Sequence, residues 1–410
     1  MAAELRKIAV IGGGASGLIA ALLASEKNSV TLFEKQKKIG RKILVSGNGR
    51  CNITNRNIRA DKYHGGDIRF IEAVLKKFGL KETVSFFESI GLPLVEEKNG
   101  KLYPASLQSS TVVKIFAYEL SRRNVAVELH RKIESIVKTE NGFKLETAGK
   151  EIYEFDAVVL ASGSNAYTAA GSSMSGYELA ASLGHKIIET FPAILPVNIS
   201  NKNLHKLEGI KWDCGCRILL DGAVLASSTG EVLFTSYGLS GPAALDISRE
   251  LNNNLIHGRT PAVEIDFFPY DSVDSLNSRL EIVLSDKGKK TSFSLLSILK
   301  ERMPDIILDA VKISTEKRNG ELSKTERENL AASLKSFRLA PGKPRDFTDA
   351  VVAAGGVSTD EINPETMESR LVKNLYITGE LLDVDGDSGG FNLQFAWSSG
   401  AIAGRALSGI

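Results

Sequence analysis

Three glycines near the start of the chain have the spacing of a dinucleotide-binding turn. Gly12, Gly14 and Gly17 form a G-x-G-x-x-G pattern, and Glu34 follows 22 residues after Gly12. In such a turn the first glycine allows the bend, the second lets a pyrophosphate approach the backbone, and the third lets a helix pack closely on a strand. The phosphates would meet the N–H groups of that helix, and Glu34 would accept hydrogen bonds from ribose hydroxyls. The pattern alone does not separate NAD from FAD.

The residues around the turn predict the strand–helix–strand unit that this chemistry requires. Residues 7–11 are apolar and β-branched, as in a strand buried on both faces. Residues 18–22 continue as a helix, and residues 29–33 form a second strand that ends at the acid. Three further residues are expected at the cofactor because they lie within this unit: Ala15, Ser16 and Lys35.

A second glycine cluster lies at the other end of the chain. Residues 374–378 predict a strand, and a glycine-rich turn then leads into a final helix. This arrangement suits FAD, because Glu380 could hold ribityl hydroxyls and the positive end of the helix could face the flavin edge that is negative when reduced. The alternative is an ordinary turn before a packing helix. The residues expected at the cofactor here are Gly379, Glu380, Asp383, Gly390, Phe391, Asn392 and Leu393.

Two segments between these ends carry further candidate contacts. Residues 40–55 are polar and rich in glycine, which predicts a loop that either bears function or is simply solvated. Residues 156–160 predict an apolar strand that ends in a turn of small residues. The expected contacts are Arg41 and Lys42 with phosphates, Cys51 and Asn52 near the ribityl chain or the flavin, Gly49 in the same segment, Ile133 after a strand at 125–129, and Ala161, Ser162 and Gly163 after the apolar strand.

The chain of 410 residues is long enough to predict more than one domain. From about residue 192 short alternating runs predict strands, with a hairpin turn at Asp221-Gly222. From about residue 272 the pattern is helical and includes a capping box at Ser323 and Glu326. We expect an FAD-binding domain at 1–191, a β-rich insert at 192–271, a helical insert at 272–340 and the rest of the FAD-binding domain at 341–410.

The composition narrows the class of partner. There are 51 Lys and Arg against 49 Asp and Glu, a formal net charge of +2, so no basic excess points to nucleic acid or to a membrane surface. Three cysteines are too few for a disulfide framework, and the Cys214/Cys216 pair lacks the spacing of a zinc site. We expect a cytoplasmic protein that acts on a small molecule, without a metal, nucleic acid or membrane; its oligomeric state is not readable.

The motifs together resemble a known family over the whole length of the chain. They are the opening fingerprint, Gly40-Arg41-Lys42, Arg50-Cys51-Asn52-Ile53-Thr54-Asn55, Tyr237-Gly238-Leu239-Ser240-Gly241-Pro242, Ala353-Ala354-Gly355-Gly356-Val357, and Gly379-Glu380 with Gly390-Phe391-Asn392-Leu393-Gln394. This set resembles the BaiN/YhiN-type NAD(P)/FAD-dependent oxidoreductases, also called aminoacetone oxidase family FAD-binding enzymes. The resemblance implies bound FAD and an α/β fold, namely a glutathione-reductase-like FAD-binding Rossmann fold with an inserted β-barrel-like plus helical domain.

The resemblance leaves the reaction open, because members are associated with bile-acid ring reduction and with amine oxidation. The leading hypothesis is hydride transfer through flavin N5 to a small enone-like acceptor, with NAD(P)H as donor. The donor would bind only transiently, because no second fingerprint with its own acid is visible. The alternatives are an FAD-dependent amine oxidase that produces hydrogen peroxide, an RNA-acting protein, and a flavin-binding protein without turnover. The five histidines are scattered, and no catalytic residue is readable.

Overall fold

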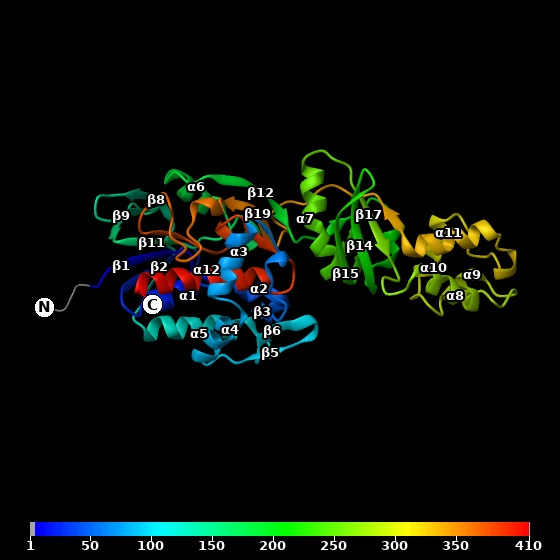
Figure 1. Cartoon of the computed structure of the whole chain (residues 1–410), viewed down its shortest axis with the longest axis horizontal. Coiled ribbons are helices and arrows are strands. Elements are labelled where there is room, and N and C mark those ends of the chain that lie inside the picture. The colour runs from blue at the N-terminus through cyan, green and yellow to red at the C-terminus, as the bar shows by residue number, and fades with distance from the viewer. Residues whose placement is uncertain (1–4, 410) are drawn as a thin grey trace. The chain divides into compact units, whose positions relative to one another are not determined.

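The computed structural model describes residues 5–409 and divides into two compact units. Unit 1 consists of Met1–Phe191 and Val351–Ile410, and unit 2 consists of Pro192–Ala350 (Figure 1). Each unit has its own cluster of buried apolar side chains. The second break lies at 350/351, after the 340/341 boundary that we predicted. Residues just past the predicted boundary still bond to unit 2, since the N–H of Gly342 donates to the carbonyl of Asn198 at 2.7 Å.

The centre of unit 1 is a five-stranded parallel sheet in the order β20-β11-β1-β2-β7. Its strands are short and largely apolar, and β1 and β11 are buried along almost their whole length. The strand order reverses between β1 and β11, and ligands of such sheets bind at the carboxyl ends of the strands at this point. The predicted Rossmann-type α/β fold is therefore confirmed. The strands are β1 (Lys7–Ile11), β2 (Ser29–Glu34), β7 (Ala126–Leu129), β11 (Ala157–Leu160) and β20 (Leu375–Ile377).

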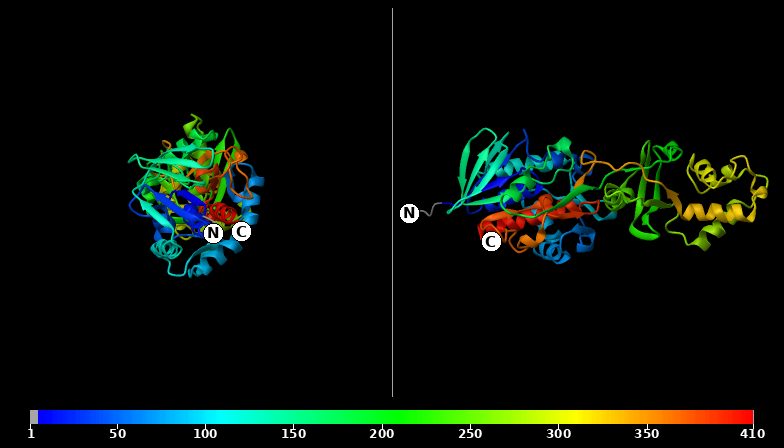
Figure 2. Two further views of the ribbon diagram at one scale, coloured as in Figure 1. Left: turned by 90° about the vertical axis from the view of Figure 1, so that its left-hand side faces the viewer. Right: turned by 90° about the horizontal axis from the view of Figure 1, so that it is seen from above.

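Helices from the two ends of the chain pack against each other in unit 1. Helix α1 (Ala15–Ala24) follows β1, and α12 (Phe391–Ser408) is the last element. The red C-terminal helix lies against the blue N-terminal elements in each view (Figure 2). Their close approach depends on glycine, because a Cβ atom at Gly400 would lie 2.2 Å from the carbonyl oxygen of Ser16. The glycine cluster at the end of the chain is thereby brought to the first glycine turn.

The remaining elements of unit 1 surround this centre. Three strands, β8 to β10, form a separate antiparallel sheet, and three short two- or three-stranded ladders complete the unit. Their bounds are α2 (Arg41–Gly49), β3 (Thr54–Asn55), β4 (Tyr63–Gly65), α3 (Ile68–Lys77), α4 (Leu80–Ser89), β5 (Leu94–Glu96), β6 (Lys101–Pro104), α5 (Ser109–Arg122), β8 (Ile133–Lys138), β9 (Phe143–Thr147), β10 (Ile152–Phe155), α6 (Ser175–Ser182), β12 (Ile187–Ala193), β19 (Val352–Val357) and β21 (Val384–Gly386).

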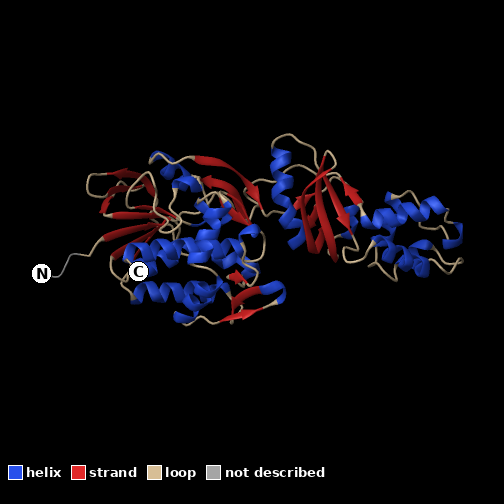
Figure 3. Cartoon of the chain, in the orientation of Figure 1, coloured by secondary structure: helices blue, strands red, loops and turns tan. Residues whose placement is uncertain are grey.

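Unit 2 contains a six-stranded antiparallel sheet. Helix α7 packs on this sheet, and helices α8 to α11 form a separate group at one end of it (Figure 3). The sheet order is β13-β16-β15-β14-β17-β18, and the long β14–β15 hairpin turns at Asp221 and Gly222, both with positive φ. The bounds are β13 (Val197–Asn198), β14 (Lys211–Leu220), β15 (Ala223–Thr235), β16 (Gly238–Ser240), α7 (Pro242–Ile256), β17 (Ala262–Asp266), α8 (Val273–Val283), α9 (Thr291–Leu295), α10 (Met303–Ala310), α11 (Lys324–Lys335) and β18 (Phe337–Leu339).

Two elements of unit 2 depart from the order of strands first and helices second. Helix α7 lies inside the segment that we predicted to be β-rich, and strand β18 lies inside the segment that we predicted to be helical. The start of α7 carries a recognisable signal, because Pro242 occupies the first turn, where its missing N–H costs nothing. Strand β18 has three residues, too few to show a period of its own.

Candidate functional site

The turn between β1 and α1 admits only glycine at two of its positions. Gly12 has φ 113°, and a Cβ atom there would lie 2.4 Å from the carbonyl oxygen of Ala161. A Cβ atom at Gly17 would lie 1.9 Å from the carbonyl oxygen of Gly12. Gly14, by contrast, faces open space, since nothing lies within 4 Å of the position that its Cβ would take. The turn therefore leaves room at Gly14 while the other two glycines hold the helix against the sheet.

The start of α1 and the end of β2 lie beside this space. No side chain caps α1 at Gly14, so the N–H groups of Ala15 and Ser16 belong to the unpaired start of the helix. The Glu34 carboxylate accepts the N–H of Gly13 at 2.9 Å, which fixes the acid next to the turn. The structure thus brings together the predicted anion-binding end of the helix and the predicted ribose-binding acid.

Small residues after β11 form the neighbouring wall. The N–H of Ala161 donates to the carbonyl of Ile11 at 2.9 Å, so this residue still belongs to the sheet. Ser162 follows with a buried hydroxyl that has no hydrogen-bond partner. Gly163 has φ 70° and faces open space on its Cβ side. Of the three residues that we predicted after this strand, Ala161 and Ser162 therefore lie against the glycine turn, and Gly163 follows them.

Unpartnered polar atoms gather at the same edge of the sheet. The side-chain oxygens of Ser162, Asn165, Tyr177 and Thr378 are buried and have no hydrogen-bond partner. Burial is the main cause that raises the pKa of Tyr177, so its hydroxyl stays protonated. Folded proteins rarely leave buried polar side chains unpaired. Ser162 and Thr378 follow the neighbouring strands β11 and β20, and Ser162 contacts the glycine turn. Unpartnered polar atoms at this place fit a polar ligand such as a dinucleotide.

The Glu380 carboxylate is held by three groups of the protein. One oxygen is 2.6 Å from Lys42 Nζ, and the other accepts the Ser164 hydroxyl at 2.7 Å and the N–H of Ala353 at 3.1 Å. We predicted that Lys42 meets a phosphate and that Glu380 meets ribityl hydroxyls. The structure pairs the two side chains with each other, and both remain partly exposed, at 31% and 18% of the side-chain surface.

The other two predicted basic contacts bind the segment after β11. Arg41 donates to the backbone carbonyl of Ala169 at 3.0 Å, and Lys35 donates to the Ser173 hydroxyl at 2.5 Å. Burial lowers the pKa of Lys35. In this structure both side chains therefore hold residues 169–173 in place.

Residues 41–49 are not the loop that we predicted. They form helix α2, which is interrupted by non-helical backbone at 46–48. The glycines there lower helix propensity, which explains why the sequence pattern concealed the helix. Gly49 has φ 79° and faces open space, whereas Cys51 is fully buried. Burial raises the pKa of Cys51 to about 12, so the thiolate is scarce and a role as a reactive thiol is not supported.

Asn52 and Ile133 contact different segments of unit 1. The Asn52 side-chain oxygen is buried without a partner and would lie 3.0 Å from a Cβ atom at Gly390. Ile133 is buried at the start of β8, where the N–H of Arg131 donates to the carbonyl of Glu34 at 3.0 Å. Asn52 therefore belongs to the C-terminal glycine cluster, and Ile133 lies near the strand that ends in the acid.

The start of α12 is pressed against β3. Gly390 has φ 105°, and a Cβ atom there would lie 2.7 Å from the carbonyl oxygen of Thr54. The carbonyl of the buried Phe391 accepts the Tyr63 hydroxyl at 3.0 Å, and Leu393 is partly exposed. At the other end of the region, a Cβ atom at Gly379 would lie 2.5 Å from the Ser16 hydroxyl oxygen. These contacts bring both ends of the chain to one site.

Two other predicted residues hold the loop before α12. Asn392 accepts the N–H of Gly386 at 2.8 Å and donates to the carbonyl of Gly386 at 2.7 Å, so its amide fastens this loop to the first turn of the helix. The N–H of Asp383 donates to the carbonyl of Val357 at 2.9 Å, and its carbonyl accepts the N–H of Gly66 at 2.8 Å. Through these bonds both residues shape the backbone of the site.

One charged cluster at this loop was not predicted from the sequence. His64 Nε2 lies 2.8 Å from one carboxylate oxygen of Asp387, and Lys62 Nζ lies 3.2 Å from the other. Burial acts to raise the pKa of Asp387, but the hydrogen bond to His64 and the charges of His64 and Lys62 outweigh it and hold the pKa below its usual value. The pairing of β4 with β21 brings these residues together, and no local pattern signals it.

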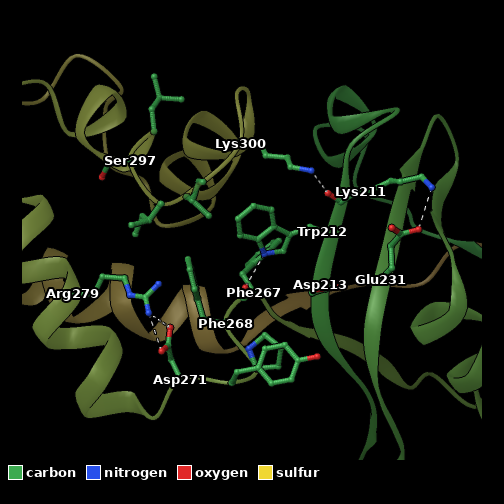
Figure 4. Close-up of a pocket in the computed structure, with 15 residues that line it drawn as sticks. Lys211, Trp212, Asp213, Glu231, Phe267, Phe268, Asp271, Arg279, Ser297 and Lys300 are labelled. Carbon is green, nitrogen blue, oxygen red and sulfur yellow. Dashed lines mark hydrogen bonds and ion pairs between the residues drawn. The ribbon is translucent and has the colours of Figure 1, made fainter. Parts of the chain in front are cut away.

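Unit 2 contains a cavity of about 920 Å³ that the sequence did not indicate (Figure 4). Its aromatic surface includes Trp212, whose indole N–H donates to the carbonyl of Phe267 at 2.8 Å, and Tyr270, which is 78% exposed. The Lys300 ammonium lies 5.8 Å from the centre of the Trp212 ring. The lining charges balance in sign: Lys211, Arg279 and Lys300 against Asp213, Glu231 and Asp271.

Comparison with known proteins identifies the family. The family described as HI0933-like protein Rossmann domain matches residues 6–406. The chain belongs to this family. The match confirms the resemblance to the BaiN/YhiN-type enzymes that the motifs carried, and the chain is accordingly an FAD-dependent oxidoreductase. Among residues 5–409, no helix is long and apolar enough to cross a membrane, and no group of three or more His, Cys, Asp or Glu residues could hold a metal ion.

The chain is similar to enzymes whose activities are given in their names. The chain is 37% identical over 408 residues to the 3-dehydro-bile acid delta(4,6)-reductase of Clostridium scindens, covering 98% of this chain and 99% of the relative. It is 30% identical over 403 residues to the ribosomal RNA dihydrouridine synthase of Escherichia coli, covering 95% of each. Among solved structures, the 3-ketosteroid delta1-dehydrogenase of Sterolibacterium denitrificans has a TM-score of 0.53 at 12% identity, with 98% of this chain and 100% of that chain covered, which shows a shared fold.

Proposed function

We propose that the protein reduces a C=C bond conjugated to a carbonyl in a small enone-like molecule, with electrons from NADH or NADPH. The observation that carries the proposal is full-length similarity to two enzymes whose names describe such a reduction. A 3-dehydro-bile acid with delta(4,6) unsaturation is a conjugated enone, and dihydrouridine forms from a uracil ring whose C=C bond is conjugated to a carbonyl. Both names therefore describe reduction of a C=C bond conjugated to a carbonyl, although the two substrates differ.

The residues of unit 1 would hold FAD in this reaction. When bound, FAD would supply the hydride-transfer chemistry, and the protein would supply position and electrostatics. The open space at Gly14 and the start of α1 suit the pyrophosphate, and Glu34 suits a ribose. The unpartnered oxygens of Ser162 and Asn52 suit the remaining polar groups of the cofactor. Such an enzyme would work in the cytoplasm, where NAD(P)H is available and free cysteines stay reduced.

Anaerobic titration of the purified protein with NADH and with NADPH tests the donor. We expect either nucleotide to bleach the flavin absorbance, and an added enone such as 2-cyclohexen-1-one to restore it. A flavin that no nicotinamide bleaches but that an amine does would instead make the protein an amine oxidase. A protein that carries flavin and responds to neither class of donor would contradict both reactions.

A second candidate function is the reduction of uridine in ribosomal RNA. It is favoured by the Escherichia coli relative and by a Haemophilus influenzae relative of the same name, which is 28% identical over 405 residues. The expectation that nucleic acid is not a partner therefore stays a prediction. The cavity of unit 2 could contribute, because the ring faces of Trp212 and Tyr270 offer surfaces on which an unpaired base can stack without a net positive charge.

The RNA candidate predicts that Trp212→Ala weakens binding of a fluorescein-labelled uridine oligonucleotide about tenfold, since stacking on an aromatic side chain is worth roughly 1–3 kcal/mol per base. Fluorescence anisotropy measures the affinity. Tyr118→Ala is the matched control, because Tyr118 is an exposed aromatic residue of unit 1, with 66% of its surface accessible. If the two variants bound the oligonucleotide equally well, the cavity would have no part in RNA binding. If the wild type did not bind it, the RNA function itself would be contradicted.

A further inference from the structure

Saturation of an enone needs an acid as well as a hydride. The hydride adds to the β-carbon, and the electrons of the C=C bond then form a bond to a proton at the α-carbon, so one hydride and one proton together complete the reduction. From the geometry of unit 1 we infer that His64 donates this proton and that Asp387 orients it. The inference rests on the proposed function, since it names the proton donor for that reaction.

His64 is the histidine whose position combines access with a carboxylate partner. Its side chain is 38% exposed, and Nε2 lies 2.8 Å from Asp387. His185 also has a carboxylate partner, but its side chain is fully buried, and its two ring nitrogens bond to Glu361 at 2.8 Å and to Ser369 at 2.9 Å. His185 is therefore a buried structural link without access to a substrate.

The other histidines bond to the backbone or lie outside the site. A ring nitrogen of His205 lies 3.0 Å from the carbonyl oxygen of Ile199, within unit 2. A ring nitrogen of His257 lies 2.7 Å from the carbonyl of Asn253 on helix α7. His130 is exposed in the turn after β7, at the far edge of the sheet from the C-terminal cluster. None of these three has a carboxylate partner among the hydrogen bonds and ion pairs of residues 5–409.

The carboxylate of Asp387 fixes which nitrogen of His64 can act. Its pKa is held below the usual value, so it stays ionised and accepts the Nε2–H of His64. Nδ1 is then left as the nitrogen that gains and loses the catalytic proton, and the negative carboxylate stabilises the imidazolium. Lys62 bonds the second oxygen of Asp387 at 3.2 Å and restrains the carboxylate in this orientation.

The backbone ties this pair to the start of α12. In the antiparallel β4–β21 ladder, His64 stands opposite Asp385. Asn392, in the first turn of α12, bonds both the N–H and the carbonyl of Gly386, the residue before Asp387. The ring of the adjacent Tyr63 packs edge-on against Phe391 at a centroid distance of 6.0 Å. His64 and Asp387 therefore lie near the start of α12, where we predicted the edge of the flavin from the sequence.

Reoxidation of the dithionite-reduced holoenzyme tests the inference without a nicotinamide. The acceptors are 2-cyclohexen-1-one, a 4-en-3-one steroid, a uridine oligonucleotide, and ferricyanide, which accepts electrons without a new C–H bond. We expect His64→Gln to slow reoxidation by whichever C=C acceptor the wild type reduces on the order of 100-fold or more, the usual contribution of a general acid. Ferricyanide should reoxidise the variant at the wild-type rate. Asp387→Asn should slow the same step less, and His257→Gln should change neither rate.

Nitrogen-15 NMR of histidine-labelled holoenzyme adds a readout apart from turnover. We expect the His64 ring to show a proton fixed on Nε2 in the wild type and to lose that fixed tautomer in Asp387→Asn. The ring of His205, whose Nε2–H donates to the carbonyl of Ile199, should keep its tautomer in both proteins. A His64→Gln variant that reduces the C=C acceptor at the wild-type rate would overturn the role of His64. A wild type that reduces none of the three C=C acceptors, yet reacts with ferricyanide, would overturn the proposed function and the inference with it.

Discussion

Replacement of Gly14 by valine is expected to leave the protein folded and to lower its affinity for FAD sharply. The backbone at Gly14 is extended, with φ −84° and ψ −172°, which a β-branched residue adopts readily. Apart from its neighbours in the chain, no atom lies within 4 Å of its Cβ position, so the new Cβ meets no protein group. It does fill the space next to the unpaired N–H groups of α1, where a pyrophosphate would approach. We expect FAD affinity to fall on the order of 100-fold, about 2.7 kcal/mol.

Flavin absorbance after purification and FAD titration of the apoprotein measure this loss. Thermal unfolding should be compared between apoproteins, because bound FAD itself stabilises the folded state. Gly17→Ala is the matched variant, and it should fail in a different way. Its Cβ would lie 1.9 Å from the carbonyl oxygen of Gly12, so α1 could not stay packed on the sheet and the protein should lose its fold. Full FAD occupancy in Gly14→Val would mean that the pyrophosphate binds elsewhere.

The sequence predicted the strand, glycine turn, helix and second strand at the start of the chain because their geometry is local. A buried strand, a glycine turn, a helix and an acid at the end of the next strand follow one another within 28 residues, from Lys7 to Glu34. Each has its own signal of period, residue type or spacing. The same holds for the Asp221-Gly222 hairpin turn and for the capping box at Ser323, where the hydroxyl accepts the N–H of Glu326 at 3.1 Å.

The sequence could not predict which charged side chains pair, because pairing depends on contacts between distant segments. From the sequence we predicted that Lys42 and Glu380 each contact the cofactor. In the structure they form an ion pair with each other, although they are 338 positions apart in the chain. His64 and Asp387 are 323 positions apart, and neither stands in a motif that mentions the other. A helix interrupted by left-handed backbone, such as α2, is equally hidden from a periodicity analysis. The cavity of unit 2 is likewise formed by segments with no shared motif.

The fold itself does not choose the substrate, since one fold supports many reactions. The proposed reaction rests on the glycine turn of unit 1 and on relatives whose names describe a reductase and a dihydrouridine synthase. The near balance of 51 basic and 49 acidic residues favours a small molecule over RNA, whereas the names of two relatives favour RNA. The choice between them therefore rests on which acceptor reoxidises the reduced enzyme.

A large effect on stability is also expected at Gly400, where alanine should destabilise the protein although alanine is the better helix former by about 1 kcal/mol. A Cβ atom there would lie 2.2 Å from the carbonyl oxygen of Ser16 and 2.7 Å from the Ile19 side chain, both on α1. Two buried helices must then separate, which costs roughly 3 kcal/mol when a tight core is overpacked. Because Ser16 lies in the first turn of α1, the separation also displaces the predicted phosphate site, and FAD affinity should fall with stability.

Denaturant unfolding followed by circular dichroism, together with FAD titration, measures both effects of Gly400→Ala. Gly149→Ala is a suitable control, because the nearest atoms to its Cβ position are side-chain oxygens at 3.6 Å, an ordinary contact distance. That variant should match the wild type in both measurements. If Gly400→Ala were instead more stable than the wild type, helix propensity would outweigh packing and α12 could not lie as close to α1 as the structure has it. If it lost stability but kept FAD affinity, the phosphate site would be independent of the contact between the two ends of the chain.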